Sequence, residues 1–106
     1  MTDKIVVMST CSDEEEAKRI SRALVEDRVA ACVNIVPGLL SYYRWQGAVE
    51  SAPEWLLLIK STREKFDALR NALEKAHSYE VPEIVALPVV DGSLNYLNWI
   101  DGSLRP

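Results

Sequence analysis

The first half of the chain alternates between apolar, strand-sized stretches and one segment with helical spacing. Lys4–Cys11 is apolar, rich in β-branched residues and too short for a helix, so we expect a buried strand. Ser12-Asp13-Glu14-Glu15 then has the form of a capping box, and apolar residues follow it at helical spacing. These signals predict a helix over 13–27. The next apolar stretch, Ala31–Tyr43, predicts a second strand region, which Pro37-Gly38 interrupts.

The second half of the chain shows the same succession of signals. Glu54–Ser61 predicts a strand, although Ser51-Ala52-Pro53 disturbs its beginning. Ser61-Thr62-Arg63-Glu64 has the form of a second capping box and opens a helix that should end near His77-Ser78. Ile84–Val90 predicts a last strand.

The C-terminal part completes a recognisable order of elements. Proline cannot donate to a sheet ladder, so Pro88 inside Ile84–Val90 argues for an edge strand or a bulge. Ser93 is suited to cap a short last helix. The order β-α-β-β-α-β plus a short C-terminal helix is the split βαβ pattern of ferredoxin-like α+β folds, an antiparallel sheet with helices on one face. We expect one domain over 1–106.

The dipeptide Pro37-Gly38 allows two interpretations. A turn there would fold Ala31–Tyr43 back into two short strands, whereas a bulge would leave one long bent strand. A single strand of this length would span about 43 Å at ~3.3 Å per residue. A compact chain of this size has a diameter of roughly 34 Å, so such a strand would protrude and need a partner for its backbone.

Composition narrows the function classes. The chain has 12 basic and 16 acidic residues and a net charge of −4, which argues against nucleic acid as a partner. The longest apolar run, Trp55–Ile59, is strand-sized, so we expect no membrane span. The N-terminus lacks the order of a signal peptide, which makes the cytoplasm the expected location. Two cysteines, Cys11 and Cys32, are expected to be reduced there.

The residue types that carry chemistry are sparse. Met8–Asp13 holds one thiol where a copper chaperone of this fold would present two, and the central strand Trp55–Ile59 is aliphatic where an RNA-binding module would be aromatic. His77, the single imidazole, is interpreted either as a cation at a helix C-terminus or as a metal ligand or acid-base group beside Tyr79, Glu80 and Glu83. This spacing is no fixed metal signature.

Five motifs in order, covering about Lys4 to Leu104, resemble the divalent-cation tolerance (CutA) family. They are Ala30-Ala31-Cys32-Val33-Asn34-Ile35-Val36-Pro37-Gly38, Tyr43-Arg44-Trp45-Gln46-Gly47, Glu54-Trp55 through Lys60-Ser61, Tyr79-Glu80-Val81-Pro82-Glu83-Ile84 and Tyr96-Leu97-Asn98-Trp99-Ile100. The resemblance implies a ferredoxin-like subunit in a tight homotrimer, with long bent strands, and it favours the bulge at Pro37-Gly38. It also implies an architecture similar to the PII signalling proteins.

The resemblance further implies a link to tolerance of copper and other divalent metals. One copper arrangement in the family uses a cysteine near the end of the first strand, where this chain has Ser9, with Cys11 two residues later. Its glutamate corresponds to Glu83, and its histidine position carries Ala76, next to His77. We therefore expect any bound Cu(II) or other divalent cation to involve these metal-ligand candidates: His77, Glu83, Cys11 and Glu80.

The predicted function is a homotrimeric cytoplasmic protein for the response to divalent metal ions, acting without catalysis. A cleft between subunits is expected to involve Trp45, Lys60, Tyr79 and Trp99. The alternative functions are a PII-like sensor of a small molecule, with only an indirect effect on metal tolerance, and an assembly scaffold. An acyl-phosphate hydrolase on the same fold would need a phosphate-binding loop with an arginine, and the first loop offers only acids.

Overall fold

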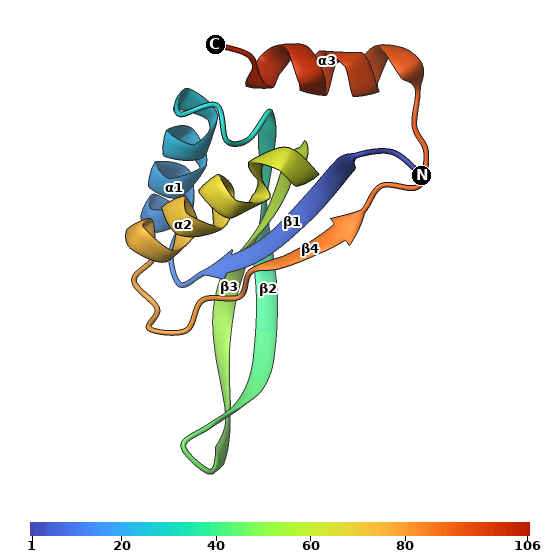
Figure 1. Ribbon diagram of the computed structural model, residues 1–106. Helices are drawn as coiled ribbons and strands as arrows, with labels where there is room; N and C mark the ends of the chain where they lie inside the picture. The colour runs from blue at the N-terminus through green and yellow to red at the C-terminus, as the bar shows by residue number, and fades with distance from the viewer.

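A computed structural model describes residues 1–106, and it consists of one antiparallel sheet, two helices on one face of it and a third helix at its end (Figure 1). The elements are β1 (Lys4–Cys11), α1 (Glu14–Glu26), β2 (Cys32–Trp45), β3 (Ala48–Thr62), the 3₁₀ turn η1 (Arg63–Lys65), α2 (Phe66–Ala76), β4 (Val85–Pro88) and α3 (Leu94–Leu104). The strand order is β2-β3-β1-β4, and every neighbouring pair is antiparallel. The ferredoxin-like α+β fold is confirmed.

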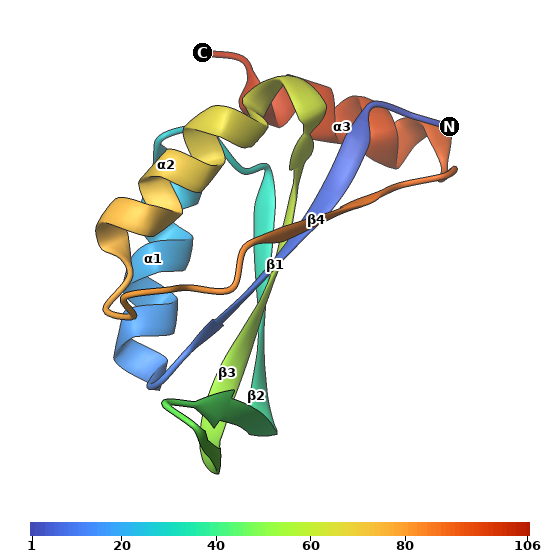
Figure 2. The ribbon, with the colours of Figure 1, turned by 60° about the horizontal axis from the view of Figure 1, so that its bottom comes forward.

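The core lies between the sheet and the helices α1 and α2. Alternate residues of the two central strands point toward the helices, among them Val7 of β1 and Leu57 and Ile59 of β3, and all three are fully buried. The helices contribute a matching apolar stripe, which includes Leu24 and Leu69. The opposite face of the sheet, seen edge-on in Figure 2, carries no helix except α3 across one end.

The bulge at Pro37-Gly38 is confirmed, and a turn there is wrong. The pairing of β2 with β3 shifts register between Val36 and Leu39, and both strands continue beyond the shift. Gly38 has a φ of 82°, a backbone conformation that favours glycine. The chain reverses instead at Gln46-Gly47. The φ values there, 48° and 81°, are those of a type I′ turn, whose twist matches that of the two strands it connects.

Strand β3 extends further than the predicted Glu54–Ser61, because it begins at Ala48 and runs through Ser51-Ala52-Pro53 without interruption. Residues 48–54 pair with β2 on one side only, since β1 ends opposite Trp55. Proline is tolerated on such an edge, where no second ladder is lost. The hairpin projects beyond the helices in Figure 1, and the molecule measures 44 × 25 × 23 Å.

Of the two helix N-termini where a capping box is predicted, only the first has a side-chain cap. Helix α1 is capped one residue later than expected, because Oδ1 of Asp13 accepts the backbone N–H of Glu16 at 2.8 Å. The second box does not form. Ser61 is still part of β3, its hydroxyl donates to the carbonyl of Val29 at 2.7 Å, and α2 begins after η1 without a side-chain cap.

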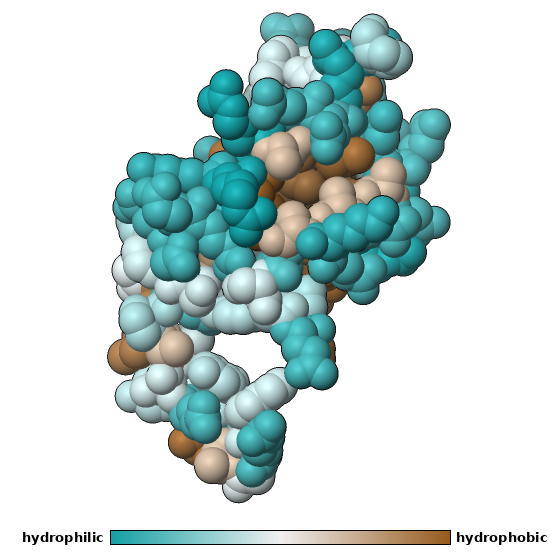
Figure 3. All heavy atoms as spheres, turned by 90° about the vertical axis from the view of Figure 1, so that its left-hand side faces the viewer, coloured by the Kyte–Doolittle hydropathy of each residue, from teal (hydrophilic) through white to brown (hydrophobic).

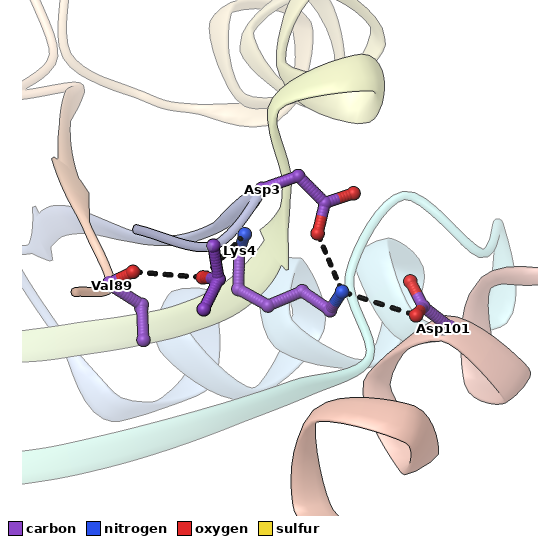
Figure 4. A network of polar contacts seen from close by, with 5 residues as sticks. Asp3, Lys4, Val89 and Asp101 are labelled. Carbon is purple, nitrogen blue, oxygen red and sulfur yellow. Dashed lines mark hydrogen bonds and ion pairs between the residues drawn. The ribbon is translucent and has the colours of Figure 1, made fainter. Parts of the chain in front are cut away.

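The C-terminal elements close one end of the sheet. Strand β4 is an edge strand, as Pro88 indicates, but it is shorter than predicted. Helix α3 is capped by Ser93, as predicted, and packs Ile100 and Leu104 against Ala31. Figure 4 shows the ammonium of Lys4 between the carboxylates of Asp3, at 2.6 Å, and Asp101, at 3.1 Å, which ties α3 to β1. None of the helices has the length and apolar character of a membrane span.

Candidate functional site

Three side chains with metal-binding chemistry meet on the helix side of the sheet, at the end of β1. Cys11 is the last residue of β1, Glu16 lies in the first turn of α1, and His77 follows directly after α2. One ligand atom from each, a sulfur, a carboxylate oxygen and a ring nitrogen, lies within 4.8 Å of the other two. The cluster exists because β1 feeds directly into α1, while α2 runs beside α1 and ends at the same edge of the molecule (Figure 1).

The ring of His77 is held by the backbone on both sides. Its Nε2 donates to the carbonyl of Thr10 at 2.6 Å, and its Nδ1 accepts the backbone N–H of Tyr79 at 3.1 Å. These two contacts occupy both ring nitrogens, one as a donor and the other as an acceptor. The ring therefore joins the segment after α2 to the end of β1.

The side chain of Glu16 is more than nine-tenths buried, and only one of its two carboxylate oxygens has a hydrogen-bond partner. Its Oε2 accepts the backbone N–H of Ser78 at 2.9 Å and lies 3.6 Å from the guanidinium of Arg19. Its Oε1 is buried and has no hydrogen-bond partner. A buried carboxylate oxygen normally has a partner, so this atom marks an incomplete part of the cluster.

The thiol of Cys11 is fully buried in acidic surroundings. Burial, together with the negative charges of Glu16, Asp13 and Glu54, raises its pKa to about 12. The thiol is therefore protonated at neutral pH, and an inert thiol of this kind is typical of a buried structural cysteine unless a cation replaces its proton.

A second buried carboxylate lies next to this cluster. Glu54 of β3 accepts the phenol hydroxyl of Tyr79 at 2.5 Å. Burial and this hydrogen bond raise the pKa of Tyr79 above its ordinary value. The rings of Tyr79 and His77 also lie against each other, with centroids 4.7 Å apart. Tyr79, predicted in a ligand cleft, thus helps to hold the segment after α2 in this chain.

The predicted metal ligands are only partly brought together. Cys11 and His77 lie in the cluster, whereas Glu80 and Glu83 are exposed and outside it. Glu16 is the residue that sequence reasoning missed. An acid in the first helical turn is explained by the helix dipole alone, and no sequence signal shows that α2 delivers His77 to it.

The other residues predicted for a cleft lie apart within one chain. Trp45 is at the tip of the hairpin, next to the turn. Lys60 lies on the face opposite α1 and α2, where its ammonium contacts Oδ1 of Asn34 and lies 3.9 Å from Sγ of Cys32. Trp99 is half-exposed on α3 and stacks on Tyr96 at 5.5 Å. Whether these residues share a cleft between subunits stays a prediction.

Comparison with known proteins agrees with this fold. The family model "CutA1 divalent ion tolerance protein" matches residues 5–103. A divalent-cation tolerance protein CutA from Thermus thermophilus is 54% identical over 90% of this chain and 92% of its own length. The human protein CutA is 45% identical over 86% of this chain, and the chain spans about half, 51%, of that longer relative.

Solved structures give the same result. The structure of a divalent cation tolerance protein from Thermus thermophilus has a TM-score of 0.90 at 52% identity, covering 92% of this chain and 94% of its own. CutA from Xylella fastidiosa has a TM-score of 0.96 at 41% identity, covering 98% of this chain and all of its own. The chain therefore belongs to the CutA1 family of divalent ion tolerance proteins.

Proposed function

We propose that this chain is a homotrimeric, cytoplasmic protein that contributes to tolerance of divalent metal ions by binding them rather than by catalysis. The observation that carries the proposal is the large part of the fold left without a partner in a single chain. This part consists of the β2-β3 hairpin and the face of the sheet opposite α1 and α2, which we call the open face.

The open face is largely apolar. The strand register places the following side chains on it: Val6, Met8, Val36, Leu56, Leu58, Val85 and Leu87. The two from β4 are about half exposed, Val85 at 47% and Leu87 at 48%. A contiguous apolar sheet face of this kind is typical of an interaction surface.

The hairpin also lacks neighbours. Between the turn and Trp55 its two strands pair only with each other. Along this part the side chains of Tyr42, Tyr43 and Trp45 are exposed. An isolated two-stranded ribbon is marginally stable in water, so a ribbon this long favours pairing with another sheet. Copies of the same chain supply such a sheet, and the number three is what the resemblance to the family implies.

The metal part of the proposal rests on the family and on donor chemistry. Relatives of this chain are named for divalent-cation tolerance. A sulfur, a carboxylate oxygen and an imidazole nitrogen suit Cu(II), Zn(II) or a similar divalent cation. A binding role is proposed over catalysis because the first loop offers acids where an acyl-phosphate hydrolase on this fold would need an arginine.

The cytoplasmic location is supported by the cysteines. Cys11 and Cys32 are both free thiols, as expected in a reducing compartment. Fractionation of cells that produce the protein tests the location directly.

The PII-like sensor remains the second candidate, and Lys60 is the observation that favours it. This ammonium forms no ion pair and lies on the open face beside Asn34 and Cys32, so an anionic metabolite held between subunits is the ligand it suits. Under this alternative the protein binds an anion and metal tolerance is indirect.

Two measurements test the proposal. Light scattering should give a particle of three 11.9 kDa chains that persists on dilution, because obligate interfaces commonly bury more than ~2,000 Å². Expression in a host strain sensitised to copper salts by loss of its own homologue should restore growth. A monomer, or a trimer that gives no protection in these cells, contradicts the proposal.

A further inference from the structure

We propose that Cys11, Glu16 and His77 form a binding site for one divalent cation of borderline softness, such as Zn²⁺, enclosed by the end of β1, the start of α1 and the segment after α2. The inference rests on the proposed function, for which it names the ligands. It differs from the ligand set expected from the sequence, because it takes its carboxylate from α1 and not from Glu80 or Glu83.

The spacing of the donors is close to what a tetrahedral ion needs. Zinc lies about 2.3 Å from sulfur and about 2.0–2.2 Å from nitrogen and oxygen, which puts ligand atoms roughly 3.3–3.7 Å apart. The three donor atoms here lie within 4.8 Å of one another. Closure by about 1.5 Å at most brings them into place, a movement within the reach of side-chain torsions.

The unpartnered oxygen of Glu16 is the second observation that points to a cation. Its Oε2 already accepts from Ser78 and lies near Arg19, and its buried Oε1 has no partner. A cation at this point would satisfy Oε1. When the metal–sulfur bond forms, the thiol proton of Cys11 leaves to solvent, and the ion's two positive charges balance one thiolate and one carboxylate.

His77 enters the site by exchanging a hydrogen bond for a metal bond. Both ring nitrogens are occupied, by Thr10 at 2.6 Å and by Tyr79 at 3.1 Å. Turning the ring toward the ion releases one of these contacts. The freed backbone group of Tyr79 can turn to water, because the residues on either side, Ser78 and Glu80, are exposed. Cation binding is therefore coupled to the segment after α2.

The test uses the intact protein with the substitution Cys32→Ser, so that Cys11 is the only remaining cysteine. Zn²⁺ titration by calorimetry should give one ion per chain, and Co²⁺ should produce the intense near-ultraviolet absorption of a cobalt–thiolate bond. X-ray absorption of the zinc complex should show one sulfur at about 2.3 Å. This last measurement needs no ligand variant and so does not depend on how the variants fold.

Ligand variants then assign the donors. Cys11→Ser should abolish the cobalt–thiolate band, and Glu16→Gln should weaken zinc binding at least about 10-fold, the loss typical of removing even an outer partner of a metal site. Glu83→Gln is the matched control and should bind as tightly as its parent. Far-ultraviolet circular dichroism and particle size establish that each variant is folded.

Three outcomes overturn the proposal: no zinc uptake by the Cys32→Ser protein, uptake without a sulfur ligand, or loss of binding in Glu83→Gln with Glu16→Gln unaffected. The proposed function fails independently of these. A trimer that protects cells from copper equally well with Cys11→Ser would leave the function standing and remove this site from it.

Discussion

At the scale of single residues, the chain concentrates its buried polar groups around the end of β1. The thiol of Cys11 and the carboxylates of Glu16 and Glu54 lie within one small region, next to the rings of His77 and Tyr79. Burying negative charge in this way costs free energy unless each group is hydrogen bonded or stays neutral. The protein meets this requirement with backbone N–H groups, one phenol and a protonated thiol, except at Oε1 of Glu16, which has no partner.

The raised pKa of Cys11 predicts a loss of stability in alkali. The thiol of the unfolded chain ionises at its ordinary pKa of 9.0, whereas the folded thiol keeps its proton to about 12. Between these values the folded state binds more protons than the unfolded state, so rising pH favours unfolding. We expect the free energy of unfolding, measured with urea, to fall from about pH 9 upward, and to fall less steeply in Cys11→Ala.

The raised pKa of Tyr79 acts in the same direction but only above its ordinary value of 10.0. The range between pH 9 and 10 therefore isolates the cysteine. Equal slopes for wild type and Cys11→Ala in that range would show that Cys11 does not hold its proton in the folded state.

The phenol of Tyr79 should stabilise the fold through Glu54. Tyr79→Phe removes the hydroxyl that donates to this buried carboxylate, and leaving a buried acceptor unsatisfied costs about 1–3 kcal/mol. Urea denaturation of Tyr79→Phe, Glu54→Leu and the double variant measures the coupling between the two residues. Additive losses would place the effect of Tyr79 elsewhere than in this hydrogen bond.

At the scale of elements, α1 depends on Asp13 rather than on the preceding serine. The carboxylate of Asp13 accepts the N–H of Glu16, and removing an N-cap of this kind costs roughly 0.5–2 kcal/mol. We therefore expect Asp13→Ala to lower the free energy of unfolding by that amount and Ser12→Ala, the matched control, to leave it within about 0.5 kcal/mol. A larger loss in Ser12→Ala would assign the cap to the residue expected from the sequence.

The bulge in β2 gives a second pair of matched variants. Gly38 has a φ of 82° with open space around it, so Gly38→Ala meets strain from its own backbone alone, about 1–2 kcal/mol. Gly102 lies inside α3, also with open space, and Gly102→Ala should stabilise by roughly 0.5–1 kcal/mol. Thermal unfolding compares the two, and shifts of the same sign would contradict the conformational argument.

Sequence patterns predicted every strand and all three α-helices, since each rests on local periodicity that the fold respects. They failed where the outcome depends on neighbours that are remote in the chain. Pro53 suggested a later start for β3, yet it is tolerated because β1 has already ended beside it. Ser61 had the local form of a cap, yet its hydroxyl is taken by Val29, more than thirty residues earlier. Glu16 was not predicted as a site residue because its neighbour His77 is also remote from it in the chain.

At the scale of the whole molecule, helices α1 and α2 cover one face of the sheet and leave the other face open. One face is sealed by α1 and α2, whose outer sides are polar. An apolar groove between them in Figure 3 is lined by alanines such as Ala68 and Ala72 and by larger residues such as Ile20 and Leu24. The open face and the hairpin expose larger apolar and aromatic side chains. Among the exposed large apolar side chains only Val25 lies on α1 or α2, and this asymmetry favours assembly through the hairpin and the open face.

Trp45 tests this view of the assembly. In a single chain its side chain is 43% exposed beside the hairpin turn, so truncation should cost little if the chain acts alone. If a neighbouring subunit covers the ring, Trp45→Ala should destabilise the assembled protein by about 3–5 kcal/mol per site, as for other buried aromatic side chains. Val25→Ala is the control, because Val25 is 41% exposed on α1, in the helical layer away from the open face. Thermal unfolding and light scattering over a range of protein concentrations separate the cases. We expect Trp45→Ala to unfold at a lower temperature and to dissociate on dilution, with Val25→Ala unchanged. Equal behaviour of the two variants would mean that the hairpin tip remains in solvent and that assembly, if it occurs, uses another surface.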